Sequence, residues 1–170
     1  MDHKLLIAWC ENPAVAGMLA EFFVESVTPD YISHGELQLG RAETPDRWSP
    51  ALIDIVTEEI HGAVEAPAPD RTLWVAVAQE ADTVVALALV SFHPSRGGLY
   101  GVIEDIVVRP TRRRHGIGHA LLDWIEADAH TRGVARLFLE SGVHNAPAHT
   151  FFQHAGYATC SVTMMKTLPT

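Results

Sequence analysis

The stretch that decides the fold is residues 102–122, which reads Val102-Ile-Glu-Asp-Ile-Val-Val-Arg-Pro-Thr-Arg-Arg-Arg-His-Gly-Ile-Gly-His-Ala-Leu-Leu122. Its first seven residues, Val102 to Val108, are rich in β-branched side chains and predict a buried strand. Arg109-Pro110 ends that strand, because proline has no N–H to donate to a ladder. Gly116-Ile117-Gly118 then opens a helix with apolar residues at helical spacing. Unpaired N–H groups at a helix start attract anions, so the segment predicts an anion cradle.

The charge of the chain supports this interpretation. The formal net charge is -9, yet four arginines lie between residues 109 and 114. The alternative is a solvated basic turn beside an ordinary helix, and the arginines alone do not separate the two interpretations. The strand before them and the paired glycines after them favour a site.

Two classes of phosphate-binding loop are excluded by the residues after the glycines. A Walker loop requires Lys and Ser or Thr directly after its last glycine, where this chain has His119-Ala120. A dinucleotide fingerprint requires a third glycine or alanine at the position of Leu121.

Length and composition are those of one domain, which we expect to span residues 1–170. No apolar run reaches the roughly 18 residues of a membrane span, and the first residues do not resemble a secretory signal. The two cysteines, Cys10 and Cys160, form no metal or redox motif and favour a cytoplasmic location. The negative charge argues against nucleic acid and weakly favours a cationic small molecule. We therefore expect no nucleic-acid or membrane partner, and a homodimer remains open.

The first part of the chain predicts helices and loops. In order, the expected elements are a strand at Leu5 to Ala8, a helix opened by Asn12-Pro13, a long loop at residues 28–49, a helix from Ser49-Pro50 to near Gly62, and a connector at residues 61–71.

After Thr72 the pattern becomes one of strands. The expected elements are strands at Leu73 to Ala78 and Val84 to Phe92 joined by Glu80-Ala81-Asp82, a turn at Pro94 to Gly98, the central strand, the helix from Gly116 ending at Gly133, a strand at Arg136 to Glu140, a short helix from Asn145 closed by Gly156, and a final strand at Ala158 to Lys166.

Two motifs in this order resemble one known family. Arg113-Arg114-His115-Gly116-Ile117-Gly118 is similar to the acyl-CoA signature Gln/Arg-x-x-Gly-x-Gly/Ala of the GNAT N-acetyltransferase superfamily. The tail, Asn145-x-x-Ala148-x-x-Phe151-Phe152-x-x-x-Gly156-Tyr157, resembles that family's segment Asn-x-x-Ala-x-x-Phe-Tyr-x-x-x-Gly-Phe/Tyr. The resemblance covers roughly residues 72–168. It implies an α/β (α+β) fold with a mixed, mostly antiparallel central sheet and helices on both faces.

The resemblance also implies acetyl-CoA as cosubstrate. The pantetheine arm would lie along Ile106, Val107 and Val108 and pair with their backbone as an added strand would. N–H groups near Val107 would polarise the thioester carbonyl. The pyrophosphate would lie on the backbone N–H groups of Arg113, Arg114, His115, Gly116, Ile117, Gly118 and His119. Asn145 and Phe152 are carried over from the tail motif as further cofactor-binding positions.

Glu104 is the candidate base, because an ammonium group must lose a proton before its nitrogen can attack. The period of a strand predicts Glu104 on the face of Ile106 and Val108, with Asp105 on the opposite face. Spermidine/spermine acetyltransferases are similar here, with a Glu-Asp pair at the same offset from the glycines. The alternative is that Glu104 or Asp105 pairs with a nearby arginine or faces water.

The tail motif departs from the family at one position. The family usually has Tyr at the second aromatic residue of the tail helix, where the hydroxyl can protonate the leaving sulfur, and this chain has Phe152. Either the thiolate leaves unaided or another donor serves.

The ten histidines do not suggest a metal site, and we expect none. His115 and His119 span the junction of loop and helix without a third ligand.

These features lead to a ranked set of functions. The first is an N-acetyltransferase that moves the acetyl group of acetyl-CoA to a primary amine of a small molecule by direct attack. The second is a protein acetyltransferase acting on an N-terminus or a lysine. The third is a regulatory module that binds acyl-CoA without turnover, and Phe152 is the one feature that favours it.

Overall fold

The computed structural model of this chain describes residues 4–169. Contacts within the chain divide it into two compact units, each built from two stretches of sequence. The first unit consists of the chain up to Val27 and of Ala51–Glu140, and the second of Thr28–Pro50 and the chain from Ser141 onward. The single domain over residues 1–170 stays a prediction.

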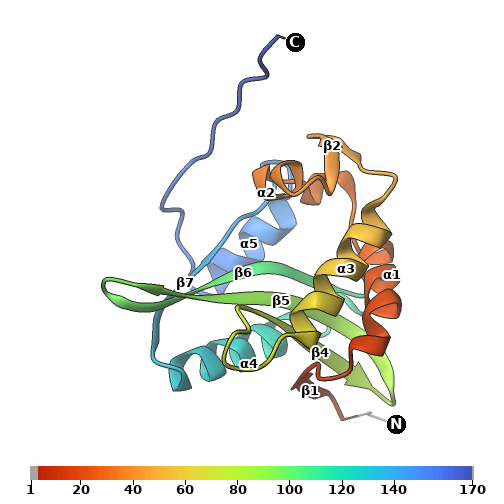
Figure 1. Cartoon of the computed structure of the whole chain (residues 1–170), viewed down its shortest axis with the longest axis vertical. Coiled ribbons are helices and arrows are strands. Elements are labelled where there is room, and N and C mark those ends of the chain that lie inside the picture. Colours follow the sequence, from red (N-terminus) through yellow and green to blue (C-terminus); the bar gives the residue numbers. More distant parts are fainter. Residues whose placement is uncertain (1–3, 170) are drawn as a thin grey trace. The chain divides into compact units, whose positions relative to one another are not determined.

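The first unit is organised around a sheet of five strands, visible in Figure 1. The strands are β1 (Leu6–Trp9), β4 (Leu73–Glu80), β5 (Thr83–Ser95), β6 (Gly98–Val108) and β7 (Val134–Leu139), in the order β1-β4-β5-β6-β7. All neighbours are antiparallel except β6 and β7, which are parallel. The mixed, mostly antiparallel sheet predicted from the sequence is therefore confirmed. The predicted hairpin is also present, because β4 and β5 pair antiparallel up to Glu80 and Thr83. Ala81 and Asp82 between them have positive φ angles, 47° and 65°.

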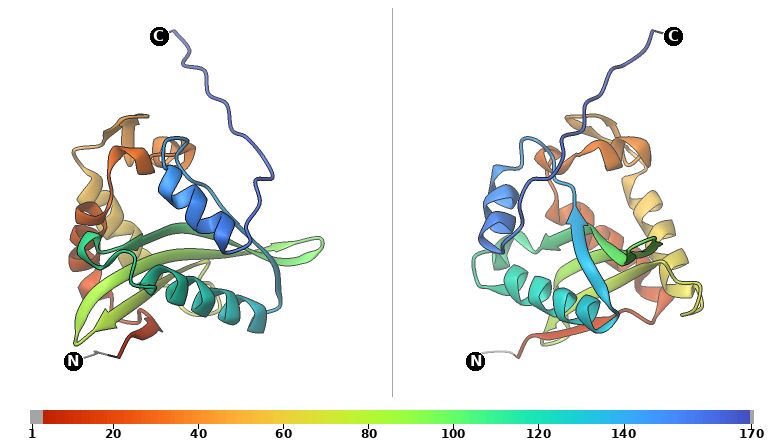
Figure 2. Two further views of the ribbon diagram at one scale, coloured as in Figure 1. Left: turned by 180° about the vertical axis from the view of Figure 1, so that it is seen from behind. Right: turned by 90° about the vertical axis from the view of Figure 1, so that its left-hand side faces the viewer.

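Helices cover both faces of this sheet, as Figures 1 and 2 show. On one face lies α4 (Ile117–Thr131), whose apolar side chains pack against small residues of the central strands. Those small residues include Ala76, Ala78, Ala86 and Ala88, which let the helix approach closely. On the other face lie α1 (Ala16–Ser26) and α3 (Leu52–Glu65). The predicted packing of helices on both faces is confirmed.

The hairpin formed by β5 and β6 is longer than the sequence predicts. The turn expected at residues 94–98 is reduced to Arg96 and Gly97, and the central strand begins at Gly98 instead of Val102. The turn is stabilised by Ser95, whose Oγ donates to the Gly98 carbonyl at 2.8 Å and accepts from the Gly97 N–H at 3.3 Å. The other predicted elements of this unit differ from the observed ones only at their ends.

The second unit shows that the predicted loop at residues 28–49 contains regular structure. It includes α2 (His34–Gln38) and a small two-stranded sheet of β2 (Ala42–Thr44) and β3 (Arg47–Trp48). Ser33 and Glu36 form a reciprocal cap at the start of α2. The long loop predicted over residues 28–49 therefore contains short helices and strands that the pattern of Pro and Gly did not reveal. The second stretch of the unit contains α5 (Ala146–His154).

The final strand predicted at residues 158–166 is absent. These residues are exposed and belong to neither of the two sheets. Strand propensity measures how well a side chain fits a half-buried pleated surface, and this segment has no neighbouring strand to supply one.

Gly142 shows how tightly the two stretches of the second unit meet. A Cβ atom there would lie 2.3 Å from the carbonyl oxygen of Asp30 and 2.6 Å from that of Ile32. We predict that Gly142→Ala lowers the free energy of unfolding by about 1–3 kcal/mol, because backbone atoms must move to admit the methyl group.

Urea unfolding measures this change, with Gly62→Ala in α3 as the matched control. No atom lies within 4 Å of a Cβ at Gly62, so the control should gain about 0.5–1 kcal/mol from its helical position. Equal stability of Gly142→Ala and the parent protein would contradict the described packing.

Candidate functional site

The candidate site begins where β6 and β7 part. Their parallel ladder runs from Leu99 paired with Val134 to Ile103 paired with Leu139, and β7 ends there. β6 continues to Val108 and stays paired with β5. The last five residues of β6 therefore extend beyond the reach of β7, toward the turn that leads into α4.

A β-bulge in β6 determines where Glu104 points. Leu89 pairs with Asp105 and Val90 pairs with Ile103, so Glu104 is the extra residue between two ladder pairs. Its carboxylate oxygen Oε1 accepts a hydrogen bond from Ser91 Oγ on β5.

Because of the bulge, the Glu104 side chain does not lie on the face of the sheet that the sequence predicts. Ile106 and Val108 pair with Ala88 and Ala86 and pack toward α4. Ser91 lies on the opposite face of β5, because alternate residues share a face and Ser91 is an odd number of residues from Ala86 and Ala88. The Glu104 carboxylate, bonded to Ser91, therefore lies on the opposite face from Ile106 and Val108, and the prediction was wrong because strict alternation ignores an inserted residue.

Two residues of this cluster were missed by the sequence analysis. Ser91 is buried, with an exposed fraction of 4%, and its Oγ lies 2.7 Å from Nε2 of His93. His93 stacks on Tyr100 of β6, with ring centroids 5.2 Å apart. The bond between Ser91 and Glu104 joins residues 13 positions apart, and no motif in the sequence signals it.

The arginines of the turn after β6 mostly bind the protein itself. The guanidinium of Arg109 donates to the Val84 carbonyl through Nε at 3.1 Å and Nη2 at 2.9 Å. Arg112 forms an ion pair with Glu80. Arg113 donates to the Val108 carbonyl at 3.2 Å and to the Ser26 carbonyl at 2.5 Å. Three guanidinium groups thus brace the turn, and the side chain of Arg114 is exposed.

The start of α4 offers backbone donors to an anion. Gly116 is the N-cap, in the left-handed conformation with φ of 78°, and no side chain caps the helix. The first N–H groups of a helix have no acceptor within it. A Cβ at Gly116 would have no atom within 4 Å, so space is open beside these donors. His115 bonds the Arg113 carbonyl through Nδ1 at 2.8 Å, and the side chains of His115 and His119 are exposed.

The first unit thus brings together most of the predicted site residues. One continuous segment carries Glu104, the strand residues 106–108 and the cradle residues 113–119. Its geometry suits a ligand with an extended polar arm and an anionic group, since an added strand and a helix start bind such groups.

Asn145 and Phe152 belong to the second unit and are described there. The Asn145 side chain accepts a hydrogen bond from the Ala148 N–H at 3.3 Å and so caps α5. Phe152 is buried, and its ring lies edge-on to Phe151 and Tyr157, with centroids 5.0 and 5.7 Å away. A contact of either residue with a cosubstrate stays a prediction.

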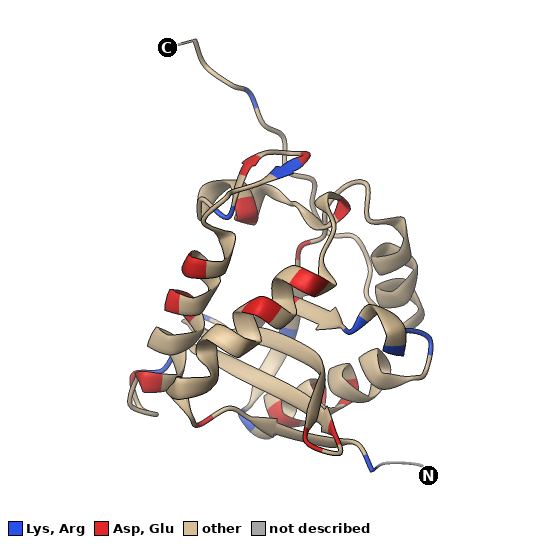
Figure 3. Cartoon of the chain, turned by 90° about the vertical axis from the view of Figure 1, so that its right-hand side faces the viewer, with Lys and Arg blue, Asp and Glu red and all other residues tan. Residues whose placement is uncertain are grey.

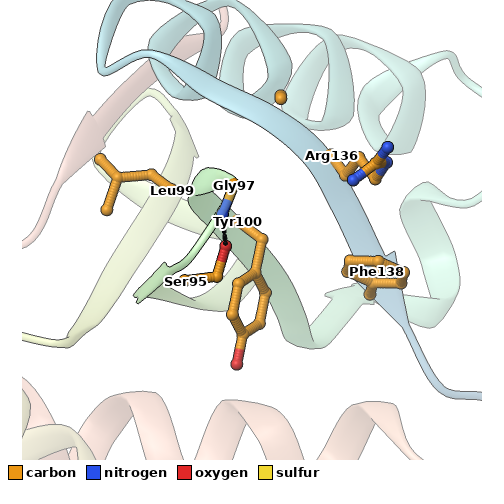
Figure 4. Close-up of a pocket in the computed structure, with 7 residues that line it drawn as sticks. Ser95, Gly97, Leu99, Tyr100, Arg136 and Phe138 are labelled. Carbon is orange, nitrogen blue, oxygen red and sulfur yellow. Dashed lines mark hydrogen bonds between the residues drawn. The ribbon is translucent and has the colours of Figure 1, made fainter.

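A separate cavity of about 380 Å³ lies between the β5–β6 hairpin and β7. Figure 4 shows its labelled lining, which includes the rings of Tyr100 and Phe138 and the side chain of Arg136. Tyr100 therefore contacts this cavity and also His93.

The described residues were also compared with what a metal site and a membrane span require, and their acidic side chains were located. Within residues 4–169, no three His, Cys, Asp or Glu side chains are grouped so that they could hold a metal ion. None of the helices in that range is both long and apolar enough to span a bilayer. Acidic residues are prominent on α1 and α3, which Figure 3 shows in red.

Comparison with known sequences identifies relatives. The family model described as "Acetyltransferase (GNAT) family" matches residues 21–157. An IAA acetyltransferase from Azospirillum brasilense is 34% identical over 82 residues, which are 48% of this chain and 52% of the relative. A streptothricin acetyltransferase from Streptomyces lavendulae is 37% identical over 101 residues, which are 59% of this chain and 51% of the relative. The chain thus spans about half the length of these curated relatives.

Solved structures share the fold over nearly the whole chain. A possible acetyltransferase from Clostridium difficile 630 has a TM-score of 0.69 at 16% identity, covering 98% of both chains. An aminoglycoside N-acetyltransferase in complex with CoA has a TM-score of 0.70 at 13% identity, covering 99% of this chain and 97% of its own.

Proposed function

The chain belongs to the acetyltransferase (GNAT) family, and from that premise we propose that it transfers an acetyl group from acetyl-CoA to a primary amine of a small molecule. The observation that carries the proposal is the uncapped, glycine-initiated start of α4, placed directly after the part of β6 that β7 does not reach. The strand edge would bind the extended arm that carries the thioester, and the helix start that follows it would bind the diphosphate at the other end of that arm.

Acetyl-CoA would be held mainly by backbone groups. The N–H groups from Arg114 to His119 would bind the diphosphate, because the helix start is uncapped and Gly116 leaves open space beside it. The N–H of Arg113, predicted to join them, instead donates to the Pro110 carbonyl at 3.5 Å. The pantetheine arm would add to β6 along Ile106, Val107 and Val108, where the ladder with β7 has ended. Asn145 and Phe152 remain proposed contacts from the family motif.

The reaction would be direct attack on the thioester. The nitrogen of the free amine would form a bond to the acetyl carbon, and the carbon–sulfur bond would break to release the thiolate of CoA. The nitrogen would lose its excess proton in this step, to the CoA thiolate or to solvent. N–H groups near Val107 would stabilise the charge on the carbonyl oxygen. Glu104 would accept the proton of the ammonium group, a role that its exposed carboxylate at the bulge supports.

A small-molecule acceptor fits the names of the relatives, and a cationic one fits the charge of the protein. The net charge is -9, and acidic residues on α1 and α3 would raise the local concentration of an ammonium compound. The relatives are named for IAA, streptothricin and aminoalkylphosphonate, all small molecules. A protein acceptor is the second candidate of the same class. The expected cytoplasmic location and the possible homodimer stay predictions.

A non-catalytic acyl-CoA-binding module is the alternative from another class. It is favoured by Phe152, which is buried against two rings and has no proton to give to a leaving thiolate.

Release of free CoA thiol from acetyl-CoA, measured against a panel of amines, separates these functions. We expect release with small primary amines that exceeds release with peptides carrying a free N-terminus or a lysine. Faster release with the peptides would favour the protein acetyltransferase. Tight binding of acetyl-CoA without release under any acceptor would leave only the binding module.

The cradle is tested by a pair of glycines at opposite ends of α4. Gly116 and Gly133 both have positive φ, 78° and 81°, and at neither would a Cβ have an atom within 4 Å. Gly116→Ala and Gly133→Ala should therefore each lose roughly 1–2 kcal/mol of stability through backbone strain.

Only Gly116→Ala should also weaken CoA binding in isothermal titration calorimetry, by about tenfold or more, because the added methyl group would occupy the open space beside the N–H groups that would bind the diphosphate. Unchanged affinity in Gly116→Ala, or the same loss in both variants, would rule out the cradle.

Glu104→Gln tests the base. We expect kcat to fall by about 100-fold or more, with little change in the KM for acetyl-CoA, because the amide cannot accept the proton. The remaining rate should rise toward the pH at which the amine itself deprotonates, about 10 for an alkylamine. Asp82→Asn, at the turn between β4 and β5, removes the same charge as a control and should leave kcat unchanged. Full activity of Glu104→Gln would remove Glu104 from the mechanism.

A further inference from the structure

We propose that Ser91 and His93 are positioning residues that orient the Glu104 carboxylate for its reaction with the acceptor ammonium group. The inference rests on the proposed function and deepens it, because it assigns two residues on β5 that no motif or family resemblance identified. Three contacts among residues of β5 and β6 carry it.

The first contact restrains a side chain that the ladder leaves unsupported. Glu104 is the inserted residue of the bulge and is exposed. An exposed glutamate samples several rotamers, and ordering it costs free energy. The hydrogen bond from Ser91 Oγ to Glu104 Oε1 selects one orientation. Ser91 can do so because it is itself buried, with only 4% of its surface exposed.

The second contact determines which way the Ser91 hydroxyl points. An ionised carboxylate can only accept hydrogen bonds, so the single hydroxyl hydrogen of Ser91 lies toward Glu104. Nε2 of His93 lies 2.7 Å from Ser91 Oγ and must therefore donate its own hydrogen to that oxygen. His93 is thus held with its hydrogen on Nε2, and this prevents Ser91 from turning its hydroxyl away from Glu104.

The third contact holds the imidazole ring. His93 stacks on Tyr100, with an interplanar angle of 29°. Tyr100 in turn lies edge-on to Phe138 of β7, with centroids 6.0 Å apart. The hydrogen-bonded line Glu104–Ser91–His93 is therefore supported by rings from β6 and β7.

The arrangement assigns separate tasks to the two carboxylate oxygens. Oε1 of Glu104 accepts from Ser91, and the described part of the chain supplies no donor to Oε2. Oε2 would then be the atom that takes the proton of the ammonium group. Ser91 and His93 do not touch the reacting atoms and carry no proton to solvent in this scheme.

The test uses variants that separate the donor of His93 from its ring. His93→Phe keeps a ring against Tyr100 and removes the donor, whereas His93→Gln keeps an N–H close to the position of Nε2. Ser91→Ala removes the hydroxyl. With an amine that the protein acetylates, we expect Ser91→Ala to lower kcat by about tenfold, the size of one lost hydrogen bond to a charged group. His93→Phe should lower kcat by up to the same factor, because it acts on Glu104 only through Ser91. The KM for acetyl-CoA should not change, and His93→Gln should recover most of the rate.

The decisive comparison is made in the Glu104→Gln background. Ser91→Ala and His93→Phe should have no further effect there, because both act through the carboxylate. An equal loss in both backgrounds, or His93→Gln as slow as His93→Phe, would overturn the proposal. Full activity of Glu104→Gln would instead refute the proposed base. A slow Glu104→Gln with unaffected Ser91→Ala and His93→Phe would refute only the positioning role.

A second measurement does not depend on turnover. Long-range ¹H–¹⁵N correlation spectra of ¹⁵N-histidine-labelled protein at alkaline pH should show the hydrogen of His93 on Nε2. In Ser91→Ala the two tautomers should be mixed. A hydrogen on Nδ1 in the parent protein would contradict the proposal even if a variant failed to fold.

Discussion

The parting of β6 from β7 is the constraint on which the rest of the site depends. β6 remains paired to β5 as far as Val108, whereas its parallel ladder with β7 ends at Ile103. The same strand then runs through a short turn into α4. A carboxylate, a strand edge and an uncapped helix start thus follow one another along one covalent segment. Their spacing is set by backbone geometry, since a strand advances about 3.3 Å per residue.

Local features of this segment could be predicted from the sequence because their causes are local. The positive φ of Gly116 follows from its residue type, and the place of the β4–β5 turn follows from the break at Glu80-Ala81-Asp82 between two apolar runs; the positive φ of Ala81 does not follow from its residue type. The face of Glu104 could not be predicted, because a bulge is a property of two strands in register. Its partner Ser91 was missed for the same reason. The prediction of a final strand at residues 158–166 was wrong, because strand propensity does not provide a neighbouring strand to pair with.

The arginines between residues 109 and 114 contribute less to the candidate anion site than their number in the sequence suggests. A cluster of arginines in an acidic protein suggests a positive surface. In the structure, Arg109 and Arg113 satisfy carbonyl groups at the start of β5 and at the end of α1, and Arg112 pairs with Glu80. Carbonyls at a helix end need such partners. The arginines therefore hold the turn in place, and the backbone donors at the start of α4 become the main candidates for anion binding.

The bulge also explains how Glu104 can lie in a strand that packs against α4. Strict alternation would place Glu104 on the face of Ile106 and Val108, which packs toward α4. A carboxylate buried there without a partner would cost several kcal/mol, and its charge would be suppressed. With one inserted residue, Ile103 and Ile106 keep their pairing with β5, and Glu104 turns to the other face beside a hydroxyl donor. The same irregularity that leaves Ile103 and Ile106 paired with β5 thus presents the Glu104 carboxylate to solvent, so a variant that removed the inserted residue would also remove the candidate base.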